Sequence, residues 1–369
     1  MTTYKESGVD IKVGDDFSKF VYKQIKSTWE TSGWNKIVTP FDNFSGVRGI
    51  DISGLEDVIL GMNFDGIGTK VEIAEKLNRY YTLGYDLMAM VCDDAVIRGA
   101  EPILVGSILD FNHIPLTHSA QLKELIEGYV NAAKEAGVQI INGEIAELGG
   151  RVQGYGPMNL NWGAGLIWLA KKDRLISGKD IAVGDKVIMF REDGFRSNGL
   201  SLVRKILEGL DAELSNNKRD FLLGSILKPS KIYSKFITKL TGGVQGEKLV
   251  NISGMAHITG GGIPGKIGRM LRPCKFGANL QGIFEPPQIM KYFQQEGKVL
   301  NAEAYKTWNM GNGFALVTKD YMKVLTLAKE NNIYAKVAGE IIEEPVIKIA
   351  DYGVYSGDTL TFNLLGEVI

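Results

Sequence analysis

Acidic side chains lie at or near the ends of the predicted strands and helices in the first half of the chain. They are Asp65, the neighbouring Asp93 and Asp94, Asp110 and Glu144. Magnesium prefers carboxylate oxygens together with phosphate oxygens and water, so carboxylates that meet at one edge of a sheet are typical of a magnesium–nucleotide site. Each acid alone is better explained by solvation or helix capping. The group favours a cation site, because Asp65 and Glu144 each lie in a Gly-containing turn directly after an apolar run.

The segment from Asp65 to Lys70 reads Asp-Gly-Ile-Gly-Thr-Lys. Gly66 and Gly68 allow backbone N–H groups to approach a phosphate closely. Thr69 adds a hydroxyl and Lys70 a positive charge. The segment is not a Walker A loop, which has four residues between its glycines and ends in Gly-Lys-Ser/Thr. It therefore predicts a phosphate-binding turn of another kind.

Two Gly-containing loops in the second half are candidate anion sites. Arg196-Ser197-Asn198-Gly199 precedes a predicted helix, whose first N–H groups can hold an anion. An ordinary helix cap explains these four residues equally well.

The other loop runs from His257 through Ile258 and Thr259 to Gly260, Gly261 and Gly262. Three consecutive glycines are costly to order, so a purely structural loop rarely needs all three. A run of backbone donors at the start of a helix suits a phosphate group of the substrate.

The composition excludes several classes of protein. With 369 residues the chain is long enough for two domains, each with its own core. The net charge of −1 provides no overall basic field for nucleic acid or an anionic membrane. Uninterrupted apolar runs stay below the roughly 20 residues of a membrane span. The polar N-terminus lacks the apolar stretch of a signal peptide, so we expect a cytoplasmic protein.

The few cysteines and histidines exclude two further kinds of site. Cys92 and Cys274 are expected to be reduced thiols rather than a disulfide framework. The three histidines are His113, His118 and His257, and their spacing does not predict a zinc site. Only His257 lies beside a candidate functional loop.

Strands alternate with helices along the first half, which predicts an α/β or α+β fold. Expected strands cover 58–64, 103–111, 138–142, 160–169 and 186–191. The polar stretch 171–184 separates the halves. We therefore expect one domain over 1–172 and a second domain over 173–369.

The order of these segments resembles the phosphoribosylformylglycinamidine cyclo-ligase, or aminoimidazole ribonucleotide synthetase, family over nearly the whole chain. Eight segments resemble family motifs in register: Tyr4 to Asp10 (Y-K-x-A-G-V-D), Asp65 to Lys70 (D-G-V-G-T-K), Gly84 to Met90 (G-I-D-L-V-A-M), Gly99 to Pro102 (G-A-E-P), Asn142 to Glu147 (G-G-E-T-A-E), Ser197 to Lys205 (S-N-G-Y-S-L-V-R-K), His257 to Gly262 (H-L-T-G-G-G) and Trp308 to Gly311 (F-N-M-G).

The resemblance implies two α/β domains and a homodimer in which N-terminal sheets of two subunits join into a barrel-like core. It implies that the domain over 1–172 binds ATP and magnesium and forms the dimer, and that the domain over 173–369 binds the substrate. It also implies de novo purine biosynthesis: ATP activates the amide oxygen of formylglycinamidine ribonucleotide, an internal nitrogen attacks, and 5-aminoimidazole ribonucleotide, ADP and phosphate form. Phosphorylation makes the amide oxygen a good leaving group, and holding amine and carbon together supplies an entropic advantage.

Site roles are carried over from the family motifs. The metal ligands would be Asp65, Asp94 and Glu144; the catalytic residues Asp65, Lys70, Asp94 and Arg196; the nucleotide contacts Lys26, Gly66, Gly68, Thr69, Asp93 and Glu144; and the substrate contacts Ser197, Asn198, His257, Thr259, Gly260, Gly261 and Gly262.

Four departures indicate a divergent member. Arg196 replaces the usual His before Ser-Asn-Gly, and an arginine cannot act as a base near neutral pH. Asp93 replaces an Asn, Ile145 replaces a Thr, and residues 41–47 match the family's G-G-F-G segment poorly.

Other functions remain open on the sequence. Selenophosphate synthetases carry a reactive residue near the N-terminus, whereas Cys92 is the first cysteine here. The hydrogenase-maturation relative ends in a cysteine, whereas this chain ends at Ile369. Thiamine-monophosphate kinase lacks a good match to the segment 257–262. A non-catalytic nucleotide-binding paralogue is favoured by Arg196 and Ile145, and the retained acids argue against it.

Overall fold

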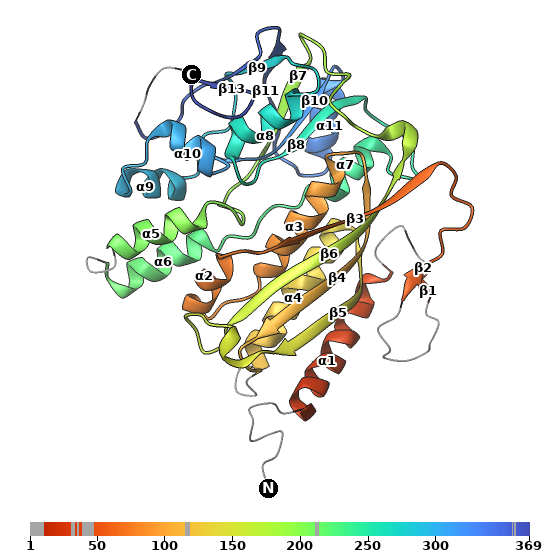
Figure 1. Ribbon diagram of the computed structural model, residues 1–369, viewed down its shortest axis with the longest axis vertical. Coiled ribbons are helices and arrows are strands. Elements are labelled where there is room, and N and C mark those ends of the chain that lie inside the picture. Colours follow the sequence, from red (N-terminus) through yellow and green to blue (C-terminus); the bar gives the residue numbers. More distant parts are fainter. Residues whose placement is uncertain are drawn as a thin grey trace.

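The computed structural model describes residues 11–30, 34, 37–38, 48–114, 119–210, 214–355, 357 and 359–369. The motif at residues 4–10, the poorly matched segment 41–47 and His118 lie outside the described residues. The described chain forms two main sheets with helices packed around them (Figure 1).

The first half contains a four-stranded sheet in the order β3-β6-β4-β5. Its strands are β3 (Val58–Gly66), β4 (Glu101–Phe111), β5 (Gln139–Glu147) and β6 (Leu160–Lys171). The β4–β5 pair is parallel and the other two pairs are antiparallel. Two further strands, β1 (Ile37–Val38) and β2 (Gly49–Ile50), form a separate pair.

One face of this sheet carries the core of the first half. Helices α3 (Leu83–Val96) and α4 (Ser119–Ala136) pack against each other, and α3 also contacts three of the strands (Figure 1). Helices α1 (Ile11–Ile25) and α2 (Lys70–Leu77) and the short turns η2 (Lys26–Thr28), η4 (Gly149–Arg151) and η5 (Lys172–Arg174) complete the half.

The opposite face of the sheet, which we call the open face, exposes large apolar side chains. They are Leu60, Met62, Phe64 and Ile108, with exposed fractions of 60%, 53%, 71% and 58%. The period-2 alternation of β3 produces this arrangement, since Asn63 points the other way and donates a hydrogen bond to the Val91 carbonyl of α3.

The second half contains a seven-stranded mixed sheet in the order β13-β12-β9-β11-β7-β10-β8. Its strands are β7 (Lys186–Arg191), β8 (Ile252–His257), β9 (Gly277–Leu280), β10 (Asn312–Thr318), β11 (Ala335–Ile342), β12 (Val346–Ile349) and β13 (Leu360–Asn363). Its helices are α5 (Leu200–Leu210), α6 (Asn216–Ile226), α7 (Ser234–Thr241), α8 (Gly262–Leu271), α9 (Gln288–Glu296), α10 (Asn301–Thr307) and α11 (Tyr321–Glu330).

Helix α3 joins the two halves, because it lies against the first sheet and also contacts α7 (Figure 1). The predicted α/β class is confirmed. The division at residues 172 and 173 stays a prediction, as does the barrel made from two subunits. Within the described residues, no helix combines the length and apolar character that a membrane crossing requires.

Candidate functional site

The candidate site lies where the glycine turn of the first half meets two loops of the second. A methyl group placed on Gly68 would lie 3.7 Å from the carbonyl oxygen of Ser197. One placed on Gly260 would lie 3.7 Å from the amide nitrogen of the Asn198 side chain. Segments more than a hundred residues apart in sequence therefore lie side by side here.

Asp65 and Asp94 approach each other at this site. Asp65 ends β3 and faces the helices, and Asp94 lies in the last turn of α3. Burial raises the pKa of Asp65, and the charge of Asp94 raises it further. The pKa of Asp94 itself is lowered, because the hydrogen bond from His257 and the nearby charges of Lys266 and Arg269 outweigh its burial. A cation bound between the two acids would remove the unfavourable effect of Asp94 on Asp65.

Lys266 lies beside both acids and was not predicted from the sequence. It is carried by α8, the helix that begins at the three glycines. Burial lowers the pKa of Lys266, and the charges of Asp94 and Asp65 partly oppose that shift. Its position four residues after Gly262 is a usable sequence signal, because that spacing places it one turn into the helix.

The three consecutive glycines at 260–262 have different structural roles. Gly262 has φ +59° and packs so closely on the Tyr305 carbonyl that a side chain would not fit. Gly260 and Gly261 are exposed. Only these two are therefore free to present backbone N–H groups to a ligand.

Ser197 and Asn198 carry polar atoms without partners. The Ser197 hydroxyl oxygen and the Asn198 side-chain oxygen are buried, and within the described residues neither forms a hydrogen bond. Buried polar atoms usually find a partner, so these two indicate a ligand. Thr259 is also buried, at 6% exposure.

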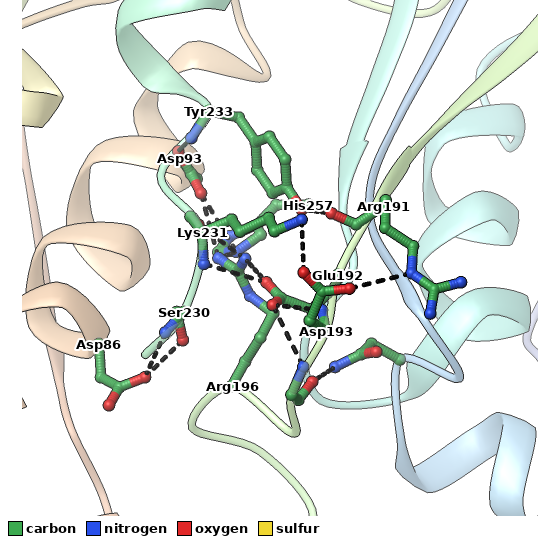
Figure 2. A network of polar contacts seen from close by, with 12 residues as sticks. Asp86, Asp93, Arg191, Glu192, Asp193, Arg196, Ser230, Lys231, Tyr233 and His257 are labelled. Carbon is green, nitrogen blue, oxygen red and sulfur yellow. Dashed lines mark hydrogen bonds and ion pairs between the residues drawn. The ribbon is translucent and has the colours of Figure 1, made fainter. Parts of the chain in front are cut away.

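A polar network around Arg196 joins Asp93 of the first half to Glu192 and His257 of the second (Figure 2). Arg196 Nη1 donates to Glu192 Oε2 at 2.7 Å and to the Lys231 carbonyl at 2.9 Å. Arg196 Nη2 lies 3.1 Å from Asp93 Oδ2 and 2.7 Å from His257 Nε2. His257 Nδ1 in turn lies 2.7 Å from Asp94 Oδ1.

Asp93 anchors this network to α7. Its Oδ1 accepts hydrogen bonds from the backbone N–H groups of Tyr233 and Ser234, each at 2.9 Å. Complete burial raises the pKa of Asp93 to about 7, although the Arg196 charge opposes the shift. Burial works against the charge of Arg196, but Glu192 and Asp93 outweigh it, and the pKa of Arg196 rises.

The predicted catalytic role of Arg196 and the predicted substrate contact of His257 do not fit this geometry. Each side chain is 1% exposed. Four of the five Arg196 N–H groups are used within the protein, and both ring nitrogens of His257 are engaged. Burial and the Arg196 charge lower the pKa of His257 to about 4, so the ring is neutral near pH 7. Asp93 is likewise buried behind the site rather than in it.

The predicted phosphate contact of Lys70 also does not fit. Its ammonium group is fully buried and lies 2.7 Å from Asp86 Oδ1 and 2.7 Å from the Lys228 carbonyl oxygen. The same Asp86 oxygen accepts hydrogen bonds from the hydroxyl and the N–H group of Ser230. Lys70 therefore connects the two halves. Thr69, which is partly exposed, remains available to a ligand.

Glu144 does not join Asp65 and Asp94. It pairs with Ile108, which pairs with Gly163, which pairs with Gly66, so three strand spacings, about 14 Å, separate it from the end of β3. It also shares the open face with Ile108, whereas Asp65 faces the helices. Within the described residues, no group of three acidic, histidine or cysteine side chains is arranged to hold a metal ion. The structure of a single chain does not place Glu144 beside Asp65 and Asp94, and the three-residue metal site stays a prediction.

Lys26 belongs to a separate surface near Glu144. Its ammonium group lies 4.7 Å from the ring centre of Tyr22 and 5.7 Å from that of Trp29. Tyr22, Arg48 and Glu144 line a cavity of about 420 Å³. Lys26 thus lies near one wall of a cavity that Glu144 also lines, and Glu144 and Asp65 both line a larger cavity of about 810 Å³ on the open face.

Comparison with known proteins gives the family. The model "AIR synthase related protein, N-terminal domain" matches residues 52–163, and "AIR synthase related protein, C-terminal domain" matches residues 182–351. The chain belongs to the AIR synthase related family. These two matches cover most strands of both sheets and include the acids of the first half and the glycine loop of the second.

Members of this family with similar sequences are named phosphoribosylformylglycinamidine cyclo-ligase. The protein of that name from Carboxydothermus hydrogenoformans is 34% identical over 345 residues, covering 92% of this chain and 96% of the relative. The one from Methanocaldococcus jannaschii is 33% identical over 352 residues, covering 93% of each.

Solved structures support the fold. A thiamine-monophosphate kinase from Stenotrophomonas maltophilia superposes with a TM-score of 0.61 at 12% identity, covering 88% of this chain and 93% of that chain. HypE from E. coli superposes with a TM-score of 0.59 at 14% identity, covering 94% and 96%. At these identities the likeness concerns the fold alone.

The residues present fit a magnesium ion of the kind that accompanies a nucleotide. Such an ion is commonly bound by one or two carboxylates, with phosphate oxygens and waters completing the shell. Asp65 and Asp94 supply two carboxylates close enough for the charge of Asp94 to affect Asp65, and Lys266 supplies a nearby cation for phosphate. The ion would neutralise charge on a transferring phosphoryl group.

Proposed function

We propose that the protein catalyses the ATP-dependent ring closure of formylglycinamidine ribonucleotide to 5-aminoimidazole ribonucleotide, with release of ADP and phosphate, in de novo purine biosynthesis. The observation that carries the proposal is the meeting of Asp65 and Asp94 with the glycine-lined loop of the second half. The names of relatives that cover more than nine-tenths of the chain support the same reaction.

One side of the proposed site would bind ATP and magnesium, and the other side would bind the ribonucleotide. Asp65 and Asp94 would hold magnesium and with it the ATP phosphates, and Lys266 would contact the phosphate oxygens. The backbone N–H groups of Gly260 and Gly261 would bind the phosphate of the ribonucleotide. ATP would supply the phosphoryl group that makes the amide oxygen a leaving group.

Ser197 and Asn198 would orient the substrate through their unpaired buried oxygens. Both lie beside Gly68 and Gly260, between the ATP side and the substrate side. Holding the attacking nitrogen against the activated carbon in this way replaces an encounter in solution by a step within one complex.

We also propose that the protein is a cytoplasmic homodimer in which two open faces pack together. The exposed apolar side chains of β3 and β4 support this, because contiguous apolar patches are uncommon on monomers. A cavity of about 810 Å³ lies on this face, with Phe64, Ile108 and Glu144 in its lining. A second subunit would therefore cover Glu144 and complete the surroundings of Lys26.

The test is a turnover assay with purified protein, formylglycinamidine ribonucleotide, ATP and Mg²⁺. We expect ADP and the imidazole product in equal amounts, and we expect Asp94→Asn to lower kcat/KM about 100-fold. ADP release without the imidazole would indicate a different ATP-dependent reaction. Absence of turnover with intact ATP binding would reject the enzymatic proposal in favour of a nucleotide-binding protein.

A further inference from the structure

The buried guanidinium of Arg196 determines where the proton of His257 lies. Arginine carries only N–H donors and no acceptor. The 2.7 Å contact between Arg196 Nη2 and His257 Nε2 therefore requires Nε2 to be the acceptor. In a neutral imidazole the other nitrogen then carries the proton, and His257 Nδ1–H donates to Asp94 Oδ1 at 2.7 Å.

The hydrogen bond from His257 fixes the orientation of the Asp94 carboxylate. One carboxylate oxygen is held by His257, and the side chain as a whole keeps 39% of its surface exposed. Fixing one oxygen leaves the second as the accessible ligand atom on the side of Asp65.

Asp93 lies on the same side of the His257 ring as Arg196. Its Oδ2 lies 3.9 Å from His257 Nε2, on the same side as Arg196 Nη2. A carboxylate there cannot donate to Nε2. An asparagine amide at that position would provide an N–H donor to Nε2 if Arg196 were absent.

We propose that Arg196 is a positioning residue that holds His257 in the Nδ1-protonated tautomer, so that His257 orients Asp94, and that Asp93 and Arg196 form a matched pair. An asparagine at position 93 together with a histidine at position 196 would be the equivalent pair. In either pair one residue donates to His257 Nε2. Two of the four departures from the family pattern, Asp93 and Arg196, are thus in direct contact. The inference rests on the proposed function in one respect, which is that Asp94 binds magnesium and ATP.

The backbone at residue 196 is compatible with the exchange. Arg196 has φ +59°, in the left-handed region. Among residues other than glycine, His, Asn and Asp adopt this region several times more often than most. Arg196→His therefore adds no backbone strain.

The first test is the nitrogen-15 spectrum of the histidine rings in the full-length protein, without nucleotide. The chain has three histidines, so His257→Gln identifies the His257 signals by their loss. We expect an unprotonated Nε2 and a proton on Nδ1. A proton on Nε2 of the wild-type protein would overturn the proposal, and this test needs no variant to be active.

The second test is the pair of variants Arg196→His and Asp93→Asn/Arg196→His. In the single variant, Nε2 faces the Asp93 carboxylate, and we expect its proton to move to Nε2 and Mg²⁺-dependent ATP binding to weaken about 10- to 100-fold. In the double variant, the asparagine introduced at position 93 donates to Nε2, so we expect the wild-type tautomer and near wild-type binding. Binding is measured by calorimetry with and without Mg²⁺.

Two results would contradict the inference: a double variant as impaired as Arg196→His, or an Arg196→His variant with the wild-type tautomer and binding. If the single variant does not fold, the wild-type and double-variant spectra decide. Arg191→Gln is the matched control. Arg191 is the last residue of β7 and pairs with Asp193 at 3.1 Å, so its replacement should leave the His257 tautomer and ATP binding unchanged. If the wild-type protein shows the expected His257 tautomer but does not turn over the proposed substrate, the proposed function is rejected and the inference about Arg196 stands.

Discussion

Replacing Lys70 by methionine should destabilise the protein without removing a nucleotide contact. The methionine keeps most of the volume of the side chain and removes its charge. Asp86 would then be a fully buried carboxylate whose remaining partners are the hydroxyl and N–H groups of Ser230. Its other oxygen already lies buried without a hydrogen-bond partner within the described residues.

The size of the loss follows from the geometry. At 2.7 Å and an effective dielectric constant of about 20, two unit charges attract by about 6 kcal/mol. Part of this is offset because the lysine no longer has to be desolvated. Removing one partner of a buried pair typically costs about 3–5 kcal/mol, which is the loss of unfolding free energy we expect for Lys70→Met.

The assay is urea unfolding followed by circular dichroism, with ATP binding measured below the transition. Lys186→Met is the matched control, because Lys186 and Glu340 are also close, at 2.6 Å, but are partly exposed. That control should lose little stability by comparison, because solvent screens an exposed ion pair. Asp86→Asn combined with Lys70→Met should recover part of the stability. Wild-type stability of Lys70→Met together with lost ATP binding would refute this reasoning and make Lys70 a phosphate contact.

Three further outcomes are expected. Lys266→Met should lower kcat/KM about 100-fold by removing a cation beside Asp65 and Asp94, and an unchanged kcat/KM would exclude the phosphate contact. Phe64→Glu should convert the dimer to a monomer in sedimentation velocity, since this 71% exposed ring lies on the open face; an unchanged mass would place the interface elsewhere. Burial raises the pKa of Glu135, so its contribution to stability is present below its unfolded pKa and is lost as pH rises through the folded pKa. Glu135→Gln should therefore gain stability relative to wild type at pH 7 but not at pH 4, as measured by urea unfolding at both values.

The sequence predicts the loops of the site well because glycine is a local signal. The turn at Gly66 and Gly68 and the run ending at Gly262 can be recognised from their neighbours alone. The same holds for β3, whose apolar run ends at the predicted acid.

The partners of Lys70 and Arg196 could not be predicted, because they are contributed from far along the chain. Lys70 meets the Lys228 carbonyl, and Arg196 meets Asp93. A cation in a motif says nothing about whether a carboxylate from another element will neutralise it. Glu192 could have been predicted, because it directly follows an apolar strand as Asp65 does, and an acid in that position is the signal used for Asp65.

The side on which Glu144 lies was set by an irregularity that the sequence does not reveal. The register of β5 shifts between the pairs Ile140–Val105 and Asn142–Gly106, so Ile141 is an extra residue. Such a bulge exchanges the two faces for every residue that follows it. Ile145 consequently packs against the core, and Glu144 points to the open face.

The most direct test of the account is ATP binding with and without Mg²⁺, compared between wild type, Asp65→Asn and Asp94→Asn. We predict that Mg²⁺ strengthens ATP binding to the wild-type protein and that either substitution removes this strengthening while the protein stays folded. Wild-type Mg²⁺-dependent binding in both variants would contradict the placement of the nucleotide between these acids and the glycine-lined loop.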